Sequence, residues 1–218
     1  PAPLSLFELA LAATNYREAE EIDAAAFLPF GQSVAFRKAA WERAGGYPEW
    51  ASHCEDILFD LALRRDGARF AFAPDALVLF RPRESPRTFA RQYFLYARGD
   101  GVANLWPLRH AIRYGTYGAA AALLLAAWRR PGLLALLLPA GLAYTRAPLR
   151  RLRRRAPALG RRQLAAAVAL IPAIRLLGDL AKMAGYPTGL WRRLRDPALR
   201  RASAAYRRGS APMDEHST

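Results

Sequence analysis

The chain has 218 residues, of which 53% are hydrophobic and 23% are charged, and this composition excludes an intrinsically disordered protein. Its 33 lysines and arginines outnumber its 18 acidic residues, which gives a net charge of +15, and all of that surplus lies in residues 101–218. The single cysteine excludes a disulfide framework and a zinc site built from several thiolates. The basic half is therefore expected to face an anionic partner, either nucleic acid or phospholipid headgroups.

The first part of the chain begins with helical patterns separated by turn signals. Apolar residues at helical spacing predict one helix over residues 4–21 and a second over residues 33–44, which ends at a pair of glycines. Ser52 and Glu55 have the spacing of a capping box, and this motif predicts a third helix that begins at Glu55.

Two short apolar runs follow, at residues 70–72 and 76–80, and the turn residues around them predict two strands. Ser85 and Pro86 then supply an N-cap and a proline at the first helical position, which predicts a further helix that ends at Gly99. This order of elements is typical of one half of an α/β domain. We expect the missing half to lie upstream of the first residue.

An ordered series of motifs in this part of the chain resembles the family 2 glycosyltransferases. Residues 36–67 contain Phe-Arg-Lys, Gly-Gly-Tyr, Glu-Asp and Leu-Arg-Arg-Asp-Gly in that order, which is similar to the acceptor half of that family. Residues 73–76 (Ala-Pro-Asp-Ala) resemble a further segment of the same half. Residues 91–101 (RQYFLYARGDG) and 178–186 (GDLAKMAGY) resemble segments of its membrane-associated members.

The resemblance implies an α/β fold, in which this chain is the C-terminal half of a GT-A (Rossmann-like) domain. It implies the inverting transfer of a sugar from a nucleotide-sugar donor to the hydroxyl of a lipid-linked or cell-envelope glycan acceptor. A divalent metal, Mg²⁺ or Mn²⁺, is implied as well, with its main ligand motif outside this chain. We therefore expect these 218 residues on their own to be inactive.

The Glu-Asp pair supplies the candidate catalytic residues. By its place in the motif, Asp56 matches the family's general base, and Glu55 takes a supporting role or contacts the acceptor. A carboxylate is suited to this task because the acceptor hydroxyl has a pKa far above 7 and must lose its proton as the new bond forms. The alternative is structural, with Glu55 as a helix cap and Asp56 as an acid favoured by the helix dipole.

Arg91, Gln92 and Arg98 are the candidate residues for binding the leaving diphosphate. The two arginines are seven residues apart and project from one side of a predicted helix, with Gln92 beside them. An arginine neutralises a phosphate by bidentate contact, although a solvated or lipid-facing basic helix has the same pattern. The Q-x-x-R-W motif of processive members is not kept, which favours the transfer of a single sugar. We expect Cys54 to be a small buried residue and assign no metal ligand.

Residues 111–148 contain two apolar runs separated by Arg-Arg-Pro-Gly, and they predict a helical hairpin in a membrane. The runs fit two short spans or a re-entrant pair, and the alternative is two core helices of a soluble domain. Eight arginines between residues 146 and 162 favour the membrane and mark its cytoplasmic side. We therefore expect a protein of the inner membrane whose catalytic part faces the cytosol.

Four segments are expected in all: residues 1–110 as the catalytic half, 111–148 as the hairpin, 149–209 as basic amphipathic helices on the membrane, and 210–218 as a disordered tail. The expected partners are the nucleotide-sugar donor, the acceptor and anionic lipids, without nucleic acid. Two alternatives stay open, a basic nucleic-acid-binding protein and a noncatalytic membrane scaffold. The first is disfavoured because the arginines border apolar runs and no nucleic-acid-binding motif occurs.

Overall fold

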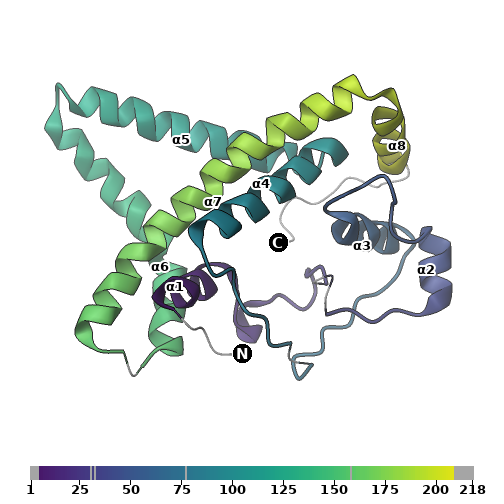
Figure 1. Cartoon of the computed structure of the whole chain (residues 1–218), viewed down its shortest axis with the longest axis horizontal. Coiled ribbons are helices and arrows are strands. Elements are labelled where there is room, and N and C mark those ends of the chain that lie inside the picture. The colour runs from purple at the N-terminus through teal and green to yellow at the C-terminus, as the bar shows by residue number, and fades with distance from the viewer. Residues whose placement is uncertain (1–4, 30, 32, 77, 158, 209–218) are drawn as a thin grey trace. The chain divides into compact units, whose positions relative to one another are not determined.

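The computed structural model of the chain describes residues 5–29, 31, 33–76, 78–157 and 159–208, and these form the helices that Figure 1 labels. In chain order, the elements are α1 (Leu6–Asn15), η1 (Ala19–Glu21), α2 (Lys38–Ala44), α3 (Glu55–Arg65), α4 (Pro86–Ala103), α5 (Pro107–Ala127), η2 (Pro131–Leu136), α6 (Leu137–Arg155), α7 (Arg161–Arg195) and α8 (Pro197–Arg208). The predicted tail at residues 210–218 lies outside the described residues.

The chain divides into two compact units, which are described separately below. Unit 1 consists of Pro1–Glu18, Leu79–Gln92 and Arg109–Ala181. Unit 2 consists of Ala19–Val78, Tyr93–Leu108 and Lys182–Thr218.

The expected α/β fold, and with it the GT-A half-domain, is wrong, because the described residues contain helices and no strand. Residues 70–72 are not helical, as predicted, but no neighbouring segment pairs with their backbone to make a ladder. Their side chains pack instead, with the rings of Phe70 and Phe72 lying 6.2 and 5.3 Å from the ring of Phe27. Of the second predicted strand, residue 77 lies outside the described residues, and those around it form no strand.

In unit 1, α1 packs against α6, and arginines of α6 satisfy the free carbonyl groups at the end of α1. Arg155 donates to the carbonyl oxygens of Ala12 and Tyr16 at 2.7 and 2.9 Å, and to the carboxylate of Glu18 at 2.7 Å. Arg151 donates to the carbonyl oxygen of Ala13 at 3.3 Å. The last turn of α1 has no basic residue of its own. The two arginines therefore supply the positive charge that the helix dipole favours at this C-terminus.

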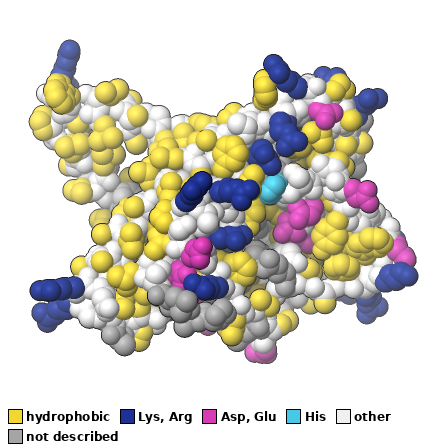
Figure 2. Space-filling model, in the orientation of Figure 1, with side chains coloured by type: hydrophobic (Ala, Val, Ile, Leu, Met, Phe, Trp, Pro, Cys, Tyr) yellow, Lys and Arg dark blue, Asp and Glu magenta, His cyan; other side chains and the backbone are white. Residues whose placement is uncertain are grey.

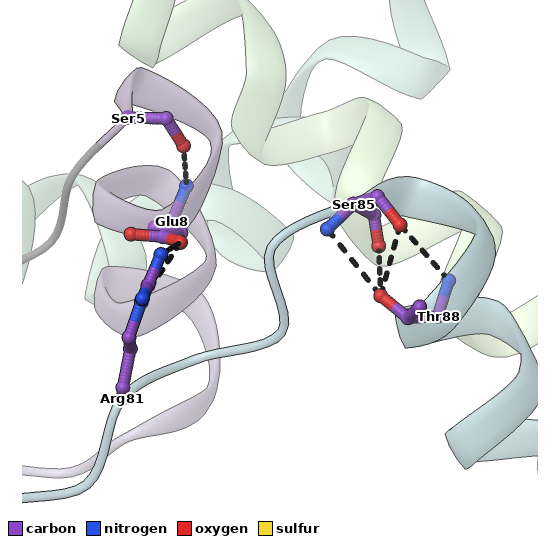
Figure 3. Close-up of polar contacts among 5 residues, drawn as sticks. All are labelled: Ser5, Glu8, Arg81, Ser85 and Thr88. Carbon is purple, nitrogen blue, oxygen red and sulfur yellow. Dashed lines mark hydrogen bonds and ion pairs between the residues drawn. The ribbon is translucent and has the colours of Figure 1, made fainter.

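An ion pair between buried Glu8 and exposed Arg81 joins α1 to the segment before α4 (Figure 3). Glu8 is buried, and its carboxylate accepts hydrogen bonds from Arg81 at 2.7 and 3.2 Å.

The Ser85 hydroxyl accepts from the backbone N–H of Thr88 at 3.3 Å, and α4 begins at Pro86. The predicted cap of this helix is therefore confirmed.

Unit 1 also contains an apolar hairpin, defined here as α5, η2 and the part of α6 up to Tyr144 (Figure 1). Figure 2 shows the arm that carries α5 and η2 covered mostly by hydrophobic side chains, with cationic side chains at its end. The exposed large apolar residues of the hairpin are Leu108, Ile112, Leu124, Leu125, Trp128, Leu134, Leu136, Leu138 and Leu142. A hairpin that leaves these side chains exposed has the surface of a membrane-inserted element.

Two stretches, Pro131–Arg155 and Arg161–Arg195, are long and apolar enough to cross a membrane. Only 6% of the apolar window of the first and 22% of that of the second is buried. The core helices of a soluble domain would be mostly buried, so these low values favour contact with lipid.

In unit 2, α4 and α7 cross with their backbones in close contact. A Cβ atom at Gly189 would collide with the carbonyl oxygen of Arg98, and one at Gly185 would collide with that of Phe94. A Cβ atom at Gly101 would meet the carbonyl oxygen of Tyr186. Glycines spaced four apart along a helix permit such an approach, and the spacing is common where helices cross in membranes.

The prediction that α4 ends at Gly99 is wrong, because the helix continues to Ala103. A Cβ atom at Gly99 would lie 2.8 Å from Cys54 Sγ and 2.9 Å from the carbonyl oxygen of His53. Glycine is therefore needed here for the approach of two segments, and it does not mark the end of the helix.

Candidate functional site

The predicted helix at the Glu-Asp pair forms, but the capping box does not. α3 begins at Glu55, as predicted, and its N-cap is Cys54 in place of Ser52. Cys54 has a left-handed backbone, with φ of 65°, which is uncommon for a residue other than glycine. Ser52 Oγ instead lies 3.1 Å from His53 Nδ1. Glu55 and Asp56 are thus the first two residues of the helix, where its dipole favours negative charge.

Asp56 is half-buried and is held on two sides. Its Oδ1 accepts a hydrogen bond of 2.8 Å from the backbone N–H of Ile57. A Cβ atom at Gly31 would lie 2.6 Å from Asp56 Oδ2, so only a glycine leaves room for the carboxylate at that position. Glu55, by contrast, is exposed. Of the two acids, Asp56 has the fixed orientation that a general base needs.

Asp60 lies one turn after Asp56 on the same face of α3, and sequence reasoning did not single it out as a site residue. It is 3% exposed, and its Oδ2 has no hydrogen-bond partner among the described residues. Burial, and then the negative charge of Asp56, raises the pKa of Asp60 to about 7. The signal in the sequence was the spacing of four between the two aspartates.

Tyr47 brings a hydroxyl to the same acids. Its ring centre lies 4.6 Å from that of Phe59, which precedes Asp60 on α3. Burial raises the pKa of Tyr47, and the charges of Asp60, Asp56 and Glu55 raise it further. The phenol therefore stays protonated and able to donate a hydrogen bond near these carboxylates.

Cationic groups lie on the other side of the start of α3. Because Gly99 packs directly on the turn of His53 and Cys54, α4 brings Arg98 to this turn. The pKa of His53 is lowered by burial and then by the positive charges of Arg98 and Arg192, so its imidazole is neutral at pH 7. Arg192, on α7, is a second site residue that the sequence analysis missed. That Arg98 binds the leaving diphosphate stays a prediction.

The other two residues predicted to bind diphosphate, Arg91 and Gln92, belong to unit 1. Gln92 Oε1 accepts a hydrogen bond of 3.1 Å from Arg83 Nε, and Arg91 is exposed. Arg98 and Asp56 both belong to unit 2. Roles for Arg91 and Gln92 at the diphosphate stay predictions.

Cys54 is 7% exposed, so the prediction that it is a small buried residue is confirmed. Its thiol lies 3.3 Å from both the carbonyl oxygen of Tyr96 and Asp100 Oδ1, to which it donates. Burial, followed by the charge of Asp100, raises the pKa of the thiol well above its ordinary value. A protonated, buried thiol is a poor nucleophile, and Cys54 instead fixes the distance between α3 and α4.

A metal site does not follow from the residues in view. No group of three or more His, Cys, Asp or Glu side chains that would hold a metal ion occurs in the described part of the chain. The described residues thus do not bring together the several oxygen ligands that Mg²⁺ or Mn²⁺ takes. The metal implied by the resemblance stays a prediction.

Comparisons of the chain with protein-family models, with curated proteins and with solved structures find no match.

Proposed function

We propose that the chain is the acceptor-binding part of a membrane-associated glycosyltransferase, which moves one sugar from a nucleotide-sugar donor to a hydroxyl acceptor. One observation carries the proposal. The segments that resemble the family lie far apart in the sequence, at residues 36–67, 91–101 and 178–186, and in unit 2 parts of the second segment contact parts of the other two. Gly99 contacts Cys54, and Gly101 contacts Tyr186.

In the proposed reaction, the oxygen of the acceptor hydroxyl attacks the anomeric carbon of the sugar while the Asp56 carboxylate removes the proton of that hydroxyl. The bond between the anomeric carbon and the nucleoside diphosphate breaks as the new bond forms, and the configuration at this carbon is inverted. Arg98, with Arg192, offsets the negative charge of the departing diphosphate. Glu55 contacts the acceptor at the exposed end of the helix.

The membrane part of the proposal places the apolar hairpin in the inner membrane, with unit 2 on the cytosolic side. The rise from Arg113 to Ala127, the last residue of α5, is about 21 Å, which is shorter than the ~30 Å hydrocarbon thickness of a bilayer. The long stems of the arginines at both ends let their charged groups reach the headgroups. The many arginines that end α6 support the cytosolic assignment.

Replacing Asp56 by asparagine in the product of the complete coding sequence tests the catalytic role. We expect sugar transfer to fall by at least about 100-fold, because a general base contributes that much, while donor binding changes by less than about twofold. Transfer is measured with a labelled nucleotide sugar, and donor binding by calorimetry. Asp75→Asn, at an exposed turn, is the matched control and should leave both unchanged.

Loss of donor binding together with transfer would show that Asp56 has a structural role. Unchanged transfer would refute the assignment of the base. Absence of transfer by wild type and variant alike would favour the noncatalytic scaffold.

A further inference from the structure

Polar side chains gather at the base of the apolar hairpin, in unit 1, which does not contain Asp56. Arg113 and Tyr117 come from α5, Tyr144 from α6, and Arg175 and Asp179 from α7. We call these five residues the basal cluster. Ionisable groups among apolar helices are costly, so a cluster of them calls for a function or for complete mutual neutralisation.

Asp179 is neutralised within the cluster. Its Oδ1 accepts from Arg113 Nε at 2.9 Å, and its Oδ2 accepts from the Tyr117 hydroxyl at 3.1 Å and from the Tyr144 hydroxyl. Arg113 Nη1 also lies 3.1 Å from His110 Nδ1. Since a guanidinium only donates, that nitrogen is the acceptor.

Because Arg113 neutralises Asp179, the positive charge of Arg175 is not compensated within the cluster. The guanidinium of Arg175 lies on the ring of Tyr144, with Cζ 3.7 Å from the ring centre, and it also hydrogen-bonds the Tyr144 side chain. Asp179 pairs with Arg113, and no ion pair of Arg175 is found among the described residues. A guanidinium stacked on a ring keeps its N–H groups in its own plane, where they form a fork for a phosphate or carboxylate. Arg113 and Asp179 balance each other, so Arg175 gives the basal cluster a net positive charge.

The cluster also lies where a lipid headgroup would be. It stands where the apolar stretches of α5 and α6 meet the base of the hairpin, and Leu176, which follows Arg175 on α7, is exposed. If the hairpin crosses the bilayer, its base lies at the level of the phosphates and exposed apolar side chains face acyl chains.

We propose that Arg175, positioned by Tyr144, binds the phosphate of an anionic membrane lipid whose acyl chains lie along exposed apolar side chains such as Leu176. The proposal rests on the membrane association proposed above and is independent of the transfer chemistry. Phosphate is the recognised group, and the lipid is its source because the site is bordered by exposed apolar side chains.

The test uses the purified full chain in a non-ionic detergent, titrated with dihexanoyl-phosphatidylglycerol and, separately, with inorganic phosphate, by native mass spectrometry. The lipid should bind and inorganic phosphate at the same concentration should not. Arg175→Gln should weaken lipid binding roughly tenfold or more, as expected for the loss of a bidentate charged contact. Arg175→Lys, which keeps the charge and loses the fork, should weaken it less.

Arg162→Gln is the matched control, since it removes the same charge from an exposed position on α7 and should leave lipid binding nearly unchanged. An equal loss of lipid binding in Arg175→Gln and Arg162→Gln would overturn the proposal and indicate unspecific electrostatic attraction. Binding of inorganic phosphate as tight as that of the lipid would overturn the lipid as its source. Flotation of wild type with phosphatidylcholine vesicles tests membrane association separately, and a chain that floats but binds lipid independently of Arg175 refutes only the site.

Discussion

Asp60→Asn tests the electrostatics of the candidate site without changing Asp56. The pKa of Asp60 is raised to about 7 in the fold, mainly by burial, against an ordinary value of 3.8. Between these two values the folded chain binds more protons than the unfolded chain, so this residue makes the protein less stable as the pH rises. From the two pKa values, the raised pKa of Asp60 lowers the free energy of unfolding by at most about 2 kcal/mol at pH 5.5 and about 4 kcal/mol at pH 8.

Asparagine has the shape of aspartic acid and no charge, so the variant should lack this pH dependence. Relative to wild type, its free energy of unfolding should rise by about 2 kcal/mol from pH 5.5 to pH 8, or roughly 4–8 °C in Tm. Thermal unfolding in a non-ionic detergent, followed by circular dichroism, measures the difference. Asp75→Asn, at an exposed turn, should follow the wild-type pH profile. Parallel profiles for wild type and Asp60→Asn would refute the buried, proton-binding carboxyl.

Two further substitutions test the packing of each unit by thermal unfolding. Gly189→Ala should cost about 1–3 kcal/mol, because its Cβ atom would meet the backbone of Arg98, whereas Gly118→Ala on α5, with open space around it, should stabilise by about 0.5–1 kcal/mol. A neutral Gly189→Ala would argue against the close crossing of α4 and α7. Arg155→Gln should cost about 2–3 kcal/mol, since it removes two hydrogen bonds to carbonyl groups at the end of α1 and the ion pair with Glu18, and hydrogen exchange of α1 should rise. Exposed Arg154 is its control, and an equal effect of Arg154→Gln would contradict the capping role.

Helix positions with a local cause could be predicted from the sequence. α3 begins at Glu55 and α4 at Pro86, because acids and proline favour the first turn of a helix wherever it lies. The left-handed glycine at position 45 ends α2 for an equally local reason.

Features that depend on distant partners could not be predicted in this way. Residues 70–72 have the composition of a strand, but a strand exists only where another segment pairs with it. Gly99 has the form of a helix end, and its actual role depends on Cys54, which is far away in the sequence. The raised pKa of Asp60 depends on burial, which spacing alone does not reveal.

The candidate site was predicted in part. Glu55 and Asp56 lie together at the start of α3, and Arg98 joins them through the packing of α4 on the turn of Cys54. Arg192 could not be found in the same way, because many arginines occur in the basic half and no motif sets this one apart.

The most direct test of the proposed function is sugar transfer by the product of the complete coding sequence, reconstituted in membranes. A panel of labelled nucleotide sugars is supplied, and both the label in lipid or glycan and the nucleoside diphosphate released are measured. We predict that one donor gives the two products in equal amounts and that Asp56→Asn abolishes both. Failure of every donor to label any acceptor, or full activity of the Asp56→Asn variant, would contradict the account.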